Sequence, residues 1–259
     1  MLLLLKLVLA PALVALATLV ARRWGPTIGG IVVGFPLSTG PIFLFLALDQ
    51  GLDFAERATV GILFGLVGVV AFALVYAAAA RRTTWPGALS AALLAFFIAS
   101  FAISLIGGGL AGAALAAYAA LILAVLIMPR AQQTVGKAPP PWWDLWLRML
   151  AAALLTLAIT TAAGWLGPIS SGIIGTFPVV STVVVSFTHH QWGAKAATAL
   201  LRGSVLSWFS FVSCFVTIGL TLHTHGLAVS LALGAASVVA TSIIVLWIDR
   251  RIGKRQLAR

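Results

Sequence analysis

Stretches of about 20 consecutive apolar residues recur along the whole chain, separated by short segments that contain glycine, proline or basic residues. Each stretch is long enough for a helix to cross the hydrocarbon layer of a membrane. Only 8% of the residues are charged, whereas a soluble domain carries about a quarter, so the chain cannot cover a water-soluble surface. The sequence therefore predicts an all-α integral membrane protein whose main partner is the lipid bilayer.

Breaks at glycine, proline and charged residues divide the chain into about nine predicted transmembrane helices. Helices are the expected spanning elements because they satisfy their own backbone hydrogen bonds in lipid. The glycines at 107–109 separate two spans that would otherwise form one over-long helix. The predicted spans are residues 2–21, 27–48, 56–80, 86–106, 110–128, 145–164, 169–188, 195–221 and 227–248.

The basic residues predict the orientation of these helices. The net charge of +11 does not indicate a nucleic-acid partner, because lysine and arginine fall between the apolar stretches rather than along one face. With nine spans, one side of the membrane collects thirteen basic residues and the other only Lys6 and Arg57. By the positive-inside rule, we expect the N-terminus in the periplasm and the C-terminus in the cytoplasm. The thirteen are Arg22, Arg23, Arg81, Arg82, Arg130, Lys137, Arg148, Lys195, Arg250, Arg251, Lys254, Arg255 and Arg259.

The two halves of the chain are related by an internal repeat. Residues 6–36 align without a gap with residues 148–178, so that Gly25-Pro26 matches Gly167-Pro168 and Phe35-Pro36 matches Phe177-Pro178. After a gap of three residues, Ala58-Thr59 matches Ala197-Thr198. Because rare residues match at fixed positions, the pattern indicates two copies of one structural unit.

The predicted organisation is four helices, one connecting helix and four helices. A connector that crosses the membrane once reverses the second copy, so the copies form an inverted repeat, as in many secondary transporters. The predicted units are 1–106 for the first repeat, 107–128 for the connecting helix, 129–143 for a proline-rich cytoplasmic linker, 144–248 for the second repeat and 249–259 for a basic cytoplasmic tail.

The second helix of each copy contains an internal Phe-Pro pair. Proline removes a backbone donor and clashes with the preceding turn, so we expect both helices to break near mid-membrane. Paired broken helices in inverted halves indicate a solute site with a polar pocket between them. A simple proline kink satisfied by serine and threonine is the alternative. The candidate solute-binding residues are Gly34, Phe35, Pro36, Ser38, Thr39, Thr176, Phe177, Pro178, Ser181 and Thr182.

The charged residues indicate which solutes would suit this site. No carboxylate lies in the middle of a predicted span, which disfavours cations. Lys6, Arg148 and Arg202 lie a turn or two inside their spans, where they either extend to the interface or attract an anion. We therefore expect a small neutral or anionic solute.

The sequence gives no indication of catalysis. No nucleophile and base are paired and no phosphate-binding motif is present, so we expect no enzyme activity and no cofactor. The histidines at 189–190 and at 223 and 225 fall on opposite sides of the membrane, so we expect no shared metal site.

One segment resembles a known family. Residues 24–36 and 55–65, which include Trp24-Gly25-Pro26, Phe35-Pro36 and Ala58-Thr59-Val60-Gly61, are similar to the GlpM-type family of small bacterial membrane proteins. Members of that family look like a single copy of this repeat. The resemblance implies a bacterial inner-membrane protein and implies no functional residues.

Three functions fit these features. The first is a secondary-transporter-like protein that moves a small solute between the two broken helices. The second is a membrane scaffold or subunit with a dry, apolar centre, and the third is a flippase for a lipid or a lipid-linked sugar. A second copy of the chain is a candidate partner in a homodimer.

Overall fold

The computed structural model describes residues 2–37, 39–106, 108–129, 141–165 and 177–257, and all of its regular structure within these ranges is helical. The all-α prediction is therefore confirmed for this part of the chain. The helices are α1 (Leu2–Trp24), α2 (Pro26–Gly34), α3 (Thr39–Gln50), α4 (Leu52–Ala79), α5 (Trp85–Ile106), α6 (Leu110–Ile127), α7 (Asp144–Trp165) and α9 (Val179–Leu257).

The long helix α9 consists of three segments rather than one straight rod. Gly193 (φ 81°, ψ 177°) and Gly226 (φ 73°, ψ 173°) adopt non-helical conformations within it, so the segments are 179–192, 194–225 and 227–257. Positive φ is accessible to glycine because it lacks a Cβ atom. The loops predicted between residues 188 and 195 and between residues 221 and 227 are therefore turns at single glycines. The last segment stays helical to Leu257, beyond its predicted end at residue 248.

The apolar character of the helices agrees with a membrane environment. Six of the described helices or helix runs are long and apolar enough to cross a membrane, and the last of them includes all three segments of α9. Large apolar side chains also cover the outside, including Ile106 at 75% and Leu126 at 77% exposure. Such a surface would be unfavourable in water but is suited to lipid. The chain thus has the structure of a membrane-embedded protein.

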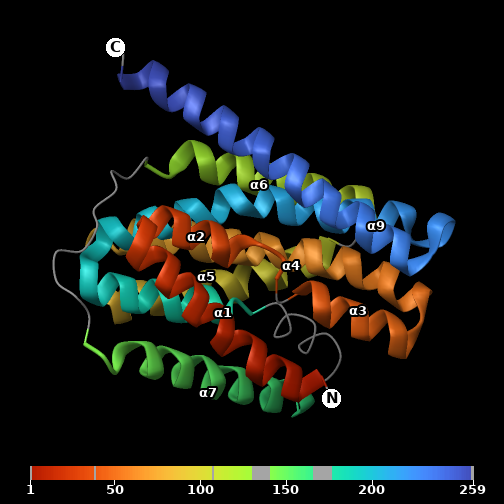
Figure 1. Ribbon diagram of the computed structural model, residues 1–259, viewed down its shortest axis with the longest axis horizontal. Helices are drawn as coiled ribbons and strands as arrows, with labels where there is room; N and C mark the ends of the chain where they lie inside the picture. The colour runs from red at the N-terminus through yellow and green to blue at the C-terminus, as the bar shows by residue number, and fades with distance from the viewer. Residues whose placement is uncertain (1, 38, 107, 130–140, 166–176, 258–259) are drawn as a thin grey trace.

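The helices form a bundle in which segments distant in sequence are neighbours. Helices α1 and α7, the first helices of the two predicted copies, lie side by side, while the last segment of α9 extends beyond the rest (Figure 1). The core contains the fully buried rings of Phe43, Phe72, Tyr76, Phe96 and Phe215.

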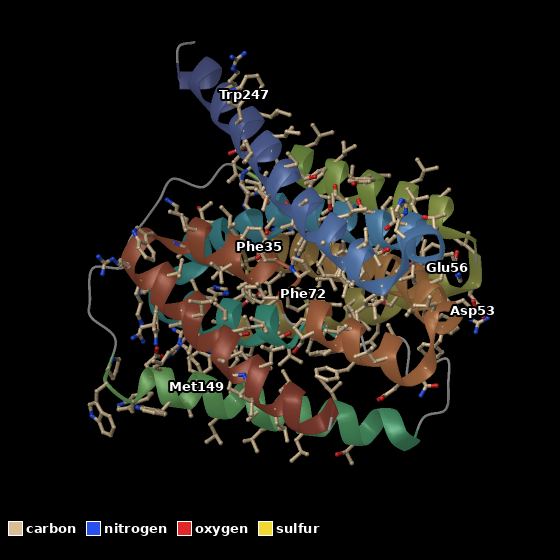
Figure 2. The ribbon with its side chains drawn as sticks, turned by 45° about the vertical axis from the view of Figure 1, so that its right-hand side comes forward. Phe35, Asp53, Glu56, Phe72, Met149 and Trp247 are labelled. Carbon is tan, nitrogen blue, oxygen red and sulfur yellow. The ribbon has the colours of Figure 1, made fainter. Side chains whose placement is uncertain are left out.

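Two ends of the bundle differ in charge. We call the end with Arg22, Asp144, Arg148, Gln191, Arg202 and Asp249 the basic end, and the end with Asp53, Glu56 and His223 the acidic end. Asp53 and Glu56 lie together at one extremity of the bundle (Figure 2).

Candidate functional site

The first Phe-Pro pair breaks its helix, as predicted. Helix α2 ends at Gly34, and Phe35 adopts an extended conformation (φ −69°, ψ 150°) before the chain resumes as α3 at Thr39. The backbone N–H of Gly40 donates to the carbonyl oxygen of Pro36 at 2.8 Å. This bond forms the first turn of the second half-helix, because proline cannot donate but still accepts. Ser38 lies outside the described residues.

The second Phe-Pro pair precedes a helix start with the same geometry. Helix α9 begins at Val179, directly after Pro178, and the N–H of Thr182 donates to the carbonyl oxygen of Pro178 at 2.8 Å. A shift of 142 residues relates this bond to the one between Gly40 and Pro36. The chain before this point, including Thr176, lies outside the described residues.

The half-helices that follow the two Phe-Pro pairs also end alike. Helix α3 ends before Gly51, which has φ 85° and ψ 174°, and the first segment of α9 ends before Gly193, with φ 81° and ψ 177°. The same shift of 142 residues relates these two glycines. Two distant segments thus share both a start and an end geometry.

The candidate solute-binding residues differ in burial. Gly34, Pro178, Ser181 and Thr182 are buried, whereas Phe35, Pro36, Thr39 and Phe177 are half-buried. Phe177 packs edge-on against Phe96 of α5, with ring centroids 5.6 Å apart. The hydroxyl oxygen of Thr182 is buried and has no hydrogen-bond partner among the described residues. A buried unpaired hydroxyl costs free energy, so it indicates a group able to bind water or solute.

Helix α2 packs unusually closely on the middle segment of α9. A Cβ atom added to Gly30 would lie 1.8 Å from the carbonyl oxygen of Leu200, and one added to Gly203 would lie 2.0 Å from that of Thr27. The hydroxyl of Ser204 donates to the carbonyl oxygen of Gly30 at 2.9 Å. Glycine therefore permits direct backbone contact, as small residues do at other membrane helix interfaces.

A small cavity lies beside this contact. It measures about 10 Å³ and is lined by residues of α2 and of the last two segments of α9, namely Ile31, Leu206, Ser207, Ser210, Ser242 and Leu246. A cavity of this size holds about one water molecule. In this conformation the cavity is too small for a solute.

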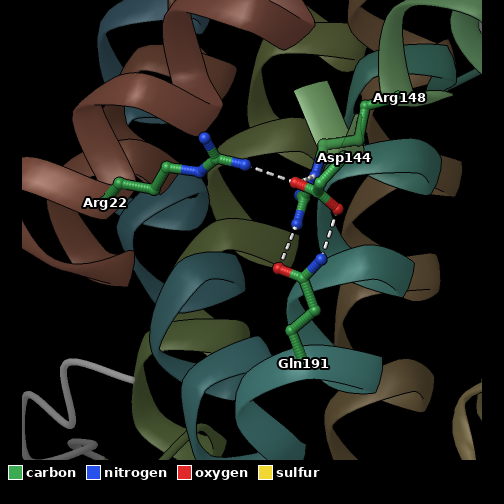
Figure 3. Close-up of polar contacts among 4 residues, drawn as sticks. All are labelled: Arg22, Asp144, Arg148 and Gln191. Carbon is green, nitrogen blue, oxygen red and sulfur yellow. Dashed lines mark hydrogen bonds and ion pairs between the residues drawn. The ribbon is translucent and has the colours of Figure 1, made fainter. Parts of the chain in front are cut away.

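A buried charged network ties three helices together at the basic end (Figure 3). Asp144, at the start of α7, is fully buried and accepts from Arg22 of α1 at 2.5 Å and from Arg148 at 2.8 Å. Gln191 of α9 donates to Asp144 and accepts from Arg148 at 2.8 Å. Asp144 and Gln191 together accept three hydrogen bonds from the two arginines, whereas Nε of Arg22 is buried without a partner among the described residues.

Arg202 has a second set of partners at the same end. Its guanidinium donates to the carbonyl oxygen of Met128 at 2.7 Å, at the C-terminus of α6, and to Asp249 of α9 at 3.1 Å. Arg148 and Arg202, two of the three candidate anion-attracting residues, thus have carboxylate partners within the protein. The third, Lys6, lies in α1, and its side chain is outside the described part. Their role toward an anion stays a prediction.

The acidic end carries a weaker connection between helices. His223 of α9 lies 3.0 Å from a carboxylate oxygen of Glu56 and 3.7 Å from one of Asp53, both in α4. All three side chains are largely exposed. Within the described residues, no group of histidine, cysteine and carboxylate side chains is placed to hold a metal ion.

The sequence analysis did not predict these contacts between helices. Asp144 and Arg148 are four residues apart, which is a recognisable helical pairing. Their contacts with Arg22 and Gln191 join residues up to 122 positions apart in sequence, and no local pattern indicates them.

Within the described residues, fold and site define a helical membrane protein with one broken helix, between α2 and α3, and with buried ion pairs at one end. The family model described as "Protein of unknown function (DUF3147)" matches residues 3–107. This match covers less than half of the chain and coincides with the first predicted repeat, 1–106. No curated protein and no solved structure matches the chain. The similarity to the GlpM-type family therefore stays a prediction.

Proposed function

We propose that this protein is a secondary-transporter-like membrane protein built from two inverted repeats. The observation that carries the proposal is a pair of half-helices that share the hydrogen bond accepted by the proline carbonyl and the glycine conformation at the far end, with Pro36 corresponding to Pro178 and Gly51 to Gly193. A family match confined to residues 3–107 supports the first repeat as a unit that occurs by itself. Paired broken helices in inverted halves are typical of transporter solute sites.

The solute site in this proposal lies between the two Phe-Pro segments. We expect its walls to include residues 34–37, 39 and 177–182, with the buried hydroxyls of Ser181 and Thr182 as hydrogen-bonding groups. The N-terminal turns of half-helices present free N–H groups and the positive end of a helix dipole. With Asp144 paired to arginines and with no carboxylate near the breaks, the site favours a small neutral or anionic solute.

The proposed location is the bacterial inner membrane, with the N-terminus in the periplasm and the C-terminus in the cytoplasm. The basic end would then face the cytoplasm, in agreement with the positive-inside rule. The acidic end would face the periplasm.

A non-transporting scaffold is the second candidate, and close packing favours it. Helix α2 contacts the backbone of α9 directly, and the neighbouring cavity has space for about one water molecule. A transporter would need these helices to separate during its cycle, whereas a scaffold would not.

Osmotic swelling of proteoliposomes distinguishes the two candidates. Purified protein would be reconstituted and challenged with glycerol, xylitol, chloride or phosphate, and with potassium as the cation control. We expect faster swelling with at least one neutral or anionic solute, and loss of that effect when Ser181 and Thr182 are both replaced by alanine. Ser90→Ala is the matched control, because Ser90 is exposed on α5 and bonds only to its own helix at Pro86.

If no solute of the panel enters faster than in protein-free vesicles, the transport proposal loses its support. If swelling occurs but is equal in the Ser181/Thr182 variant, transport uses another path.

A further inference from the structure

A stripe of polar residues follows the second Phe-Pro segment along α9. Thr182, Ser186 and His189 are spaced by four and three residues, so they lie on one face of the helix. All three are more than nine-tenths buried, at 7%, 7% and 8% exposure. The stripe runs from the proposed solute site toward the basic end.

Tyr76 of α4 faces this stripe. Its hydroxyl lies 3.2 Å from Nδ1 of His189, and the two rings pack edge-on with centroids 5.8 Å apart. The Ser186 hydroxyl of the same stripe is buried and has no hydrogen-bond partner among the described residues. Tyr76 is fully buried, so its hydroxyl and the imidazole satisfy one another inside the bundle.

The internal repeat places residues without polar side-chain atoms at the four corresponding positions, three in the first copy and one in the second. Thr182, Ser186 and His189 correspond to Gly40, Leu44 and Ala47, and Tyr76 corresponds to Phe215. In the corresponding contact between α3 and α9, Phe215 packs edge-on against Phe43, with ring centroids 5.7 Å apart. One helix contact of the repeat is thus apolar and its counterpart polar. Packing alone does not require the polar version, because the corresponding contact is made by apolar rings at a similar distance.

We propose that Tyr76 and His189, together with Ser186, form a proton-binding site that couples solute movement to protons; the coupling rests on the transport function proposed above. Histidine is the side chain whose charge changes most readily near neutral pH, and an ionisable side chain inside a membrane bundle indicates function. The ligand of this site is a proton.

Proton uptake changes the direction of the hydrogen bond. In the neutral pair, one of Nδ1 and the phenol donates to the other, depending on the tautomer. When a hydronium ion transfers its proton to the imidazole and leaves as water, both ring nitrogens carry hydrogen and Nδ1 must donate to the Tyr76 oxygen. The phenolic hydrogen then needs another acceptor, and the buried, unpaired Ser186 oxygen is the acceptor in this proposal.

The charged network next to His189 contains two arginines and one carboxylate, so it does not itself stabilise a cation there, and the hydrogen bond to Tyr76 must do so. Tyr76 faces His189 from α4, and the adjacent His190 packs on Trp85 of α5 instead. The charged residues of α1 and α7 lie next to this part of α9 at Gln191, which donates to Asp144. Asp144 also forms ion pairs with Arg22 and Arg148. Arg148 also lies over the ring of Phe187, with 4.8 Å between its Cζ and the ring centroid.

Nitrogen NMR of ¹⁵N-histidine-labelled protein in nanodiscs tests the site directly. The His189→Gln variant lacks one of the four histidine signals, which identifies that signal as His189. In the original protein, this signal should change reversibly from the neutral to the cationic form as the pH is lowered from 8 to 5. Tyr76→Phe should weaken proton binding at His189 about tenfold, because the cation loses a charge-assisted hydrogen bond. His190→Gln is the control and should leave the His189 signal unchanged.

Either of two results would overturn the site: a His189 signal that stays neutral down to pH 5, or a titration that Tyr76→Phe does not change. Size-exclusion profiles and thermal unfolding identify any variant that fails to fold, and Ser186→Ala then serves as the milder replacement with the same expected direction. If His189 titrates as described but no solute of the swelling panel is transported, the proton site stands and the transport proposal fails.

Discussion

Replacing Asp144 with asparagine should expose how much the buried network at the basic end contributes to stability. The Asp144 side chain is completely buried, and that of Arg148 is only 2% exposed. Asparagine keeps the shape of the side chain but removes its charge, so Arg148 becomes a buried cation without a counter-charge. Breaking a buried ion pair in this way costs about 3–5 kcal/mol.

A matched change at the acidic end gives the reference value. Asp53→Asn removes a carboxylate that is 84% exposed and lies 3.7 Å from His223. Exposed ion pairs contribute at most about 1 kcal/mol, so this variant should unfold almost like the original protein. The difference between the two variants therefore isolates the effect of burial.

The assay is reversible unfolding in mixed micelles with increasing dodecyl sulfate, followed by tryptophan fluorescence and circular dichroism. Arg148→Met in the Asp144→Asn background should recover part of the loss, because it removes the unmatched cation while keeping a long apolar side chain. If Asp144→Asn costs no more than Asp53→Asn, the network does not hold the three helices together, and the reasoning from burial is wrong.

Three further predictions concern packing, helix ends and orientation. Gly30→Ala should destabilise the protein by about 1–3 kcal/mol in the same unfolding assay, because the new methyl group would overlap the backbone of Leu200. Gly112→Ala, where nothing lies within 4 Å, should be tolerated. Arg202→Gln should cost about 1.5–3 kcal/mol through its lost bonds to Met128 and Asp249, which double-mutant cycles with Asp249→Asn would verify. Reporter fusions to the C-terminus should be active only in the cytoplasm, and periplasmic activity would contradict both the orientation and the inverted repeat.

The helical class and the first helix break were predictable because their causes are local. Apolar stretches predict spanning helices, and Pro36 removes a backbone donor two residues after Gly34, which weakens the helix locally. Proline alone does not decide the outcome, because Pro11 lies inside the continuous helix α1. The turns at Gly193 and Gly226 were predicted as loops, since the sequence does not indicate whether a glycine will reverse the chain within one residue. That outcome depends on how the flanking helices pack.

The polar contacts were less predictable because they depend on distant residues. His189 was considered only as a metal ligand, and its partner Tyr76 lies 113 positions earlier in the chain. Asp144 was expected at a helix end, but its complete burial results from the approach of α1 and α9. In a membrane bundle, hydrophobicity does not distinguish inside from outside, so burial cannot be inferred from residue type alone.

The unequal ion pairs at the two ends determine which end of the bundle separates more easily. At the basic end, separation of the helices would break the ion pairs of the buried Asp144 with two arginines. At the acidic end, it would break only the contacts of His223 with carboxylates that are already exposed to water. Exposed pairs are further weakened by salt, while buried ones are screened much less. The ion pairs thus favour separation at the acidic end over the basic end, and in the transport cycle proposed above a solute would enter first from the acidic side.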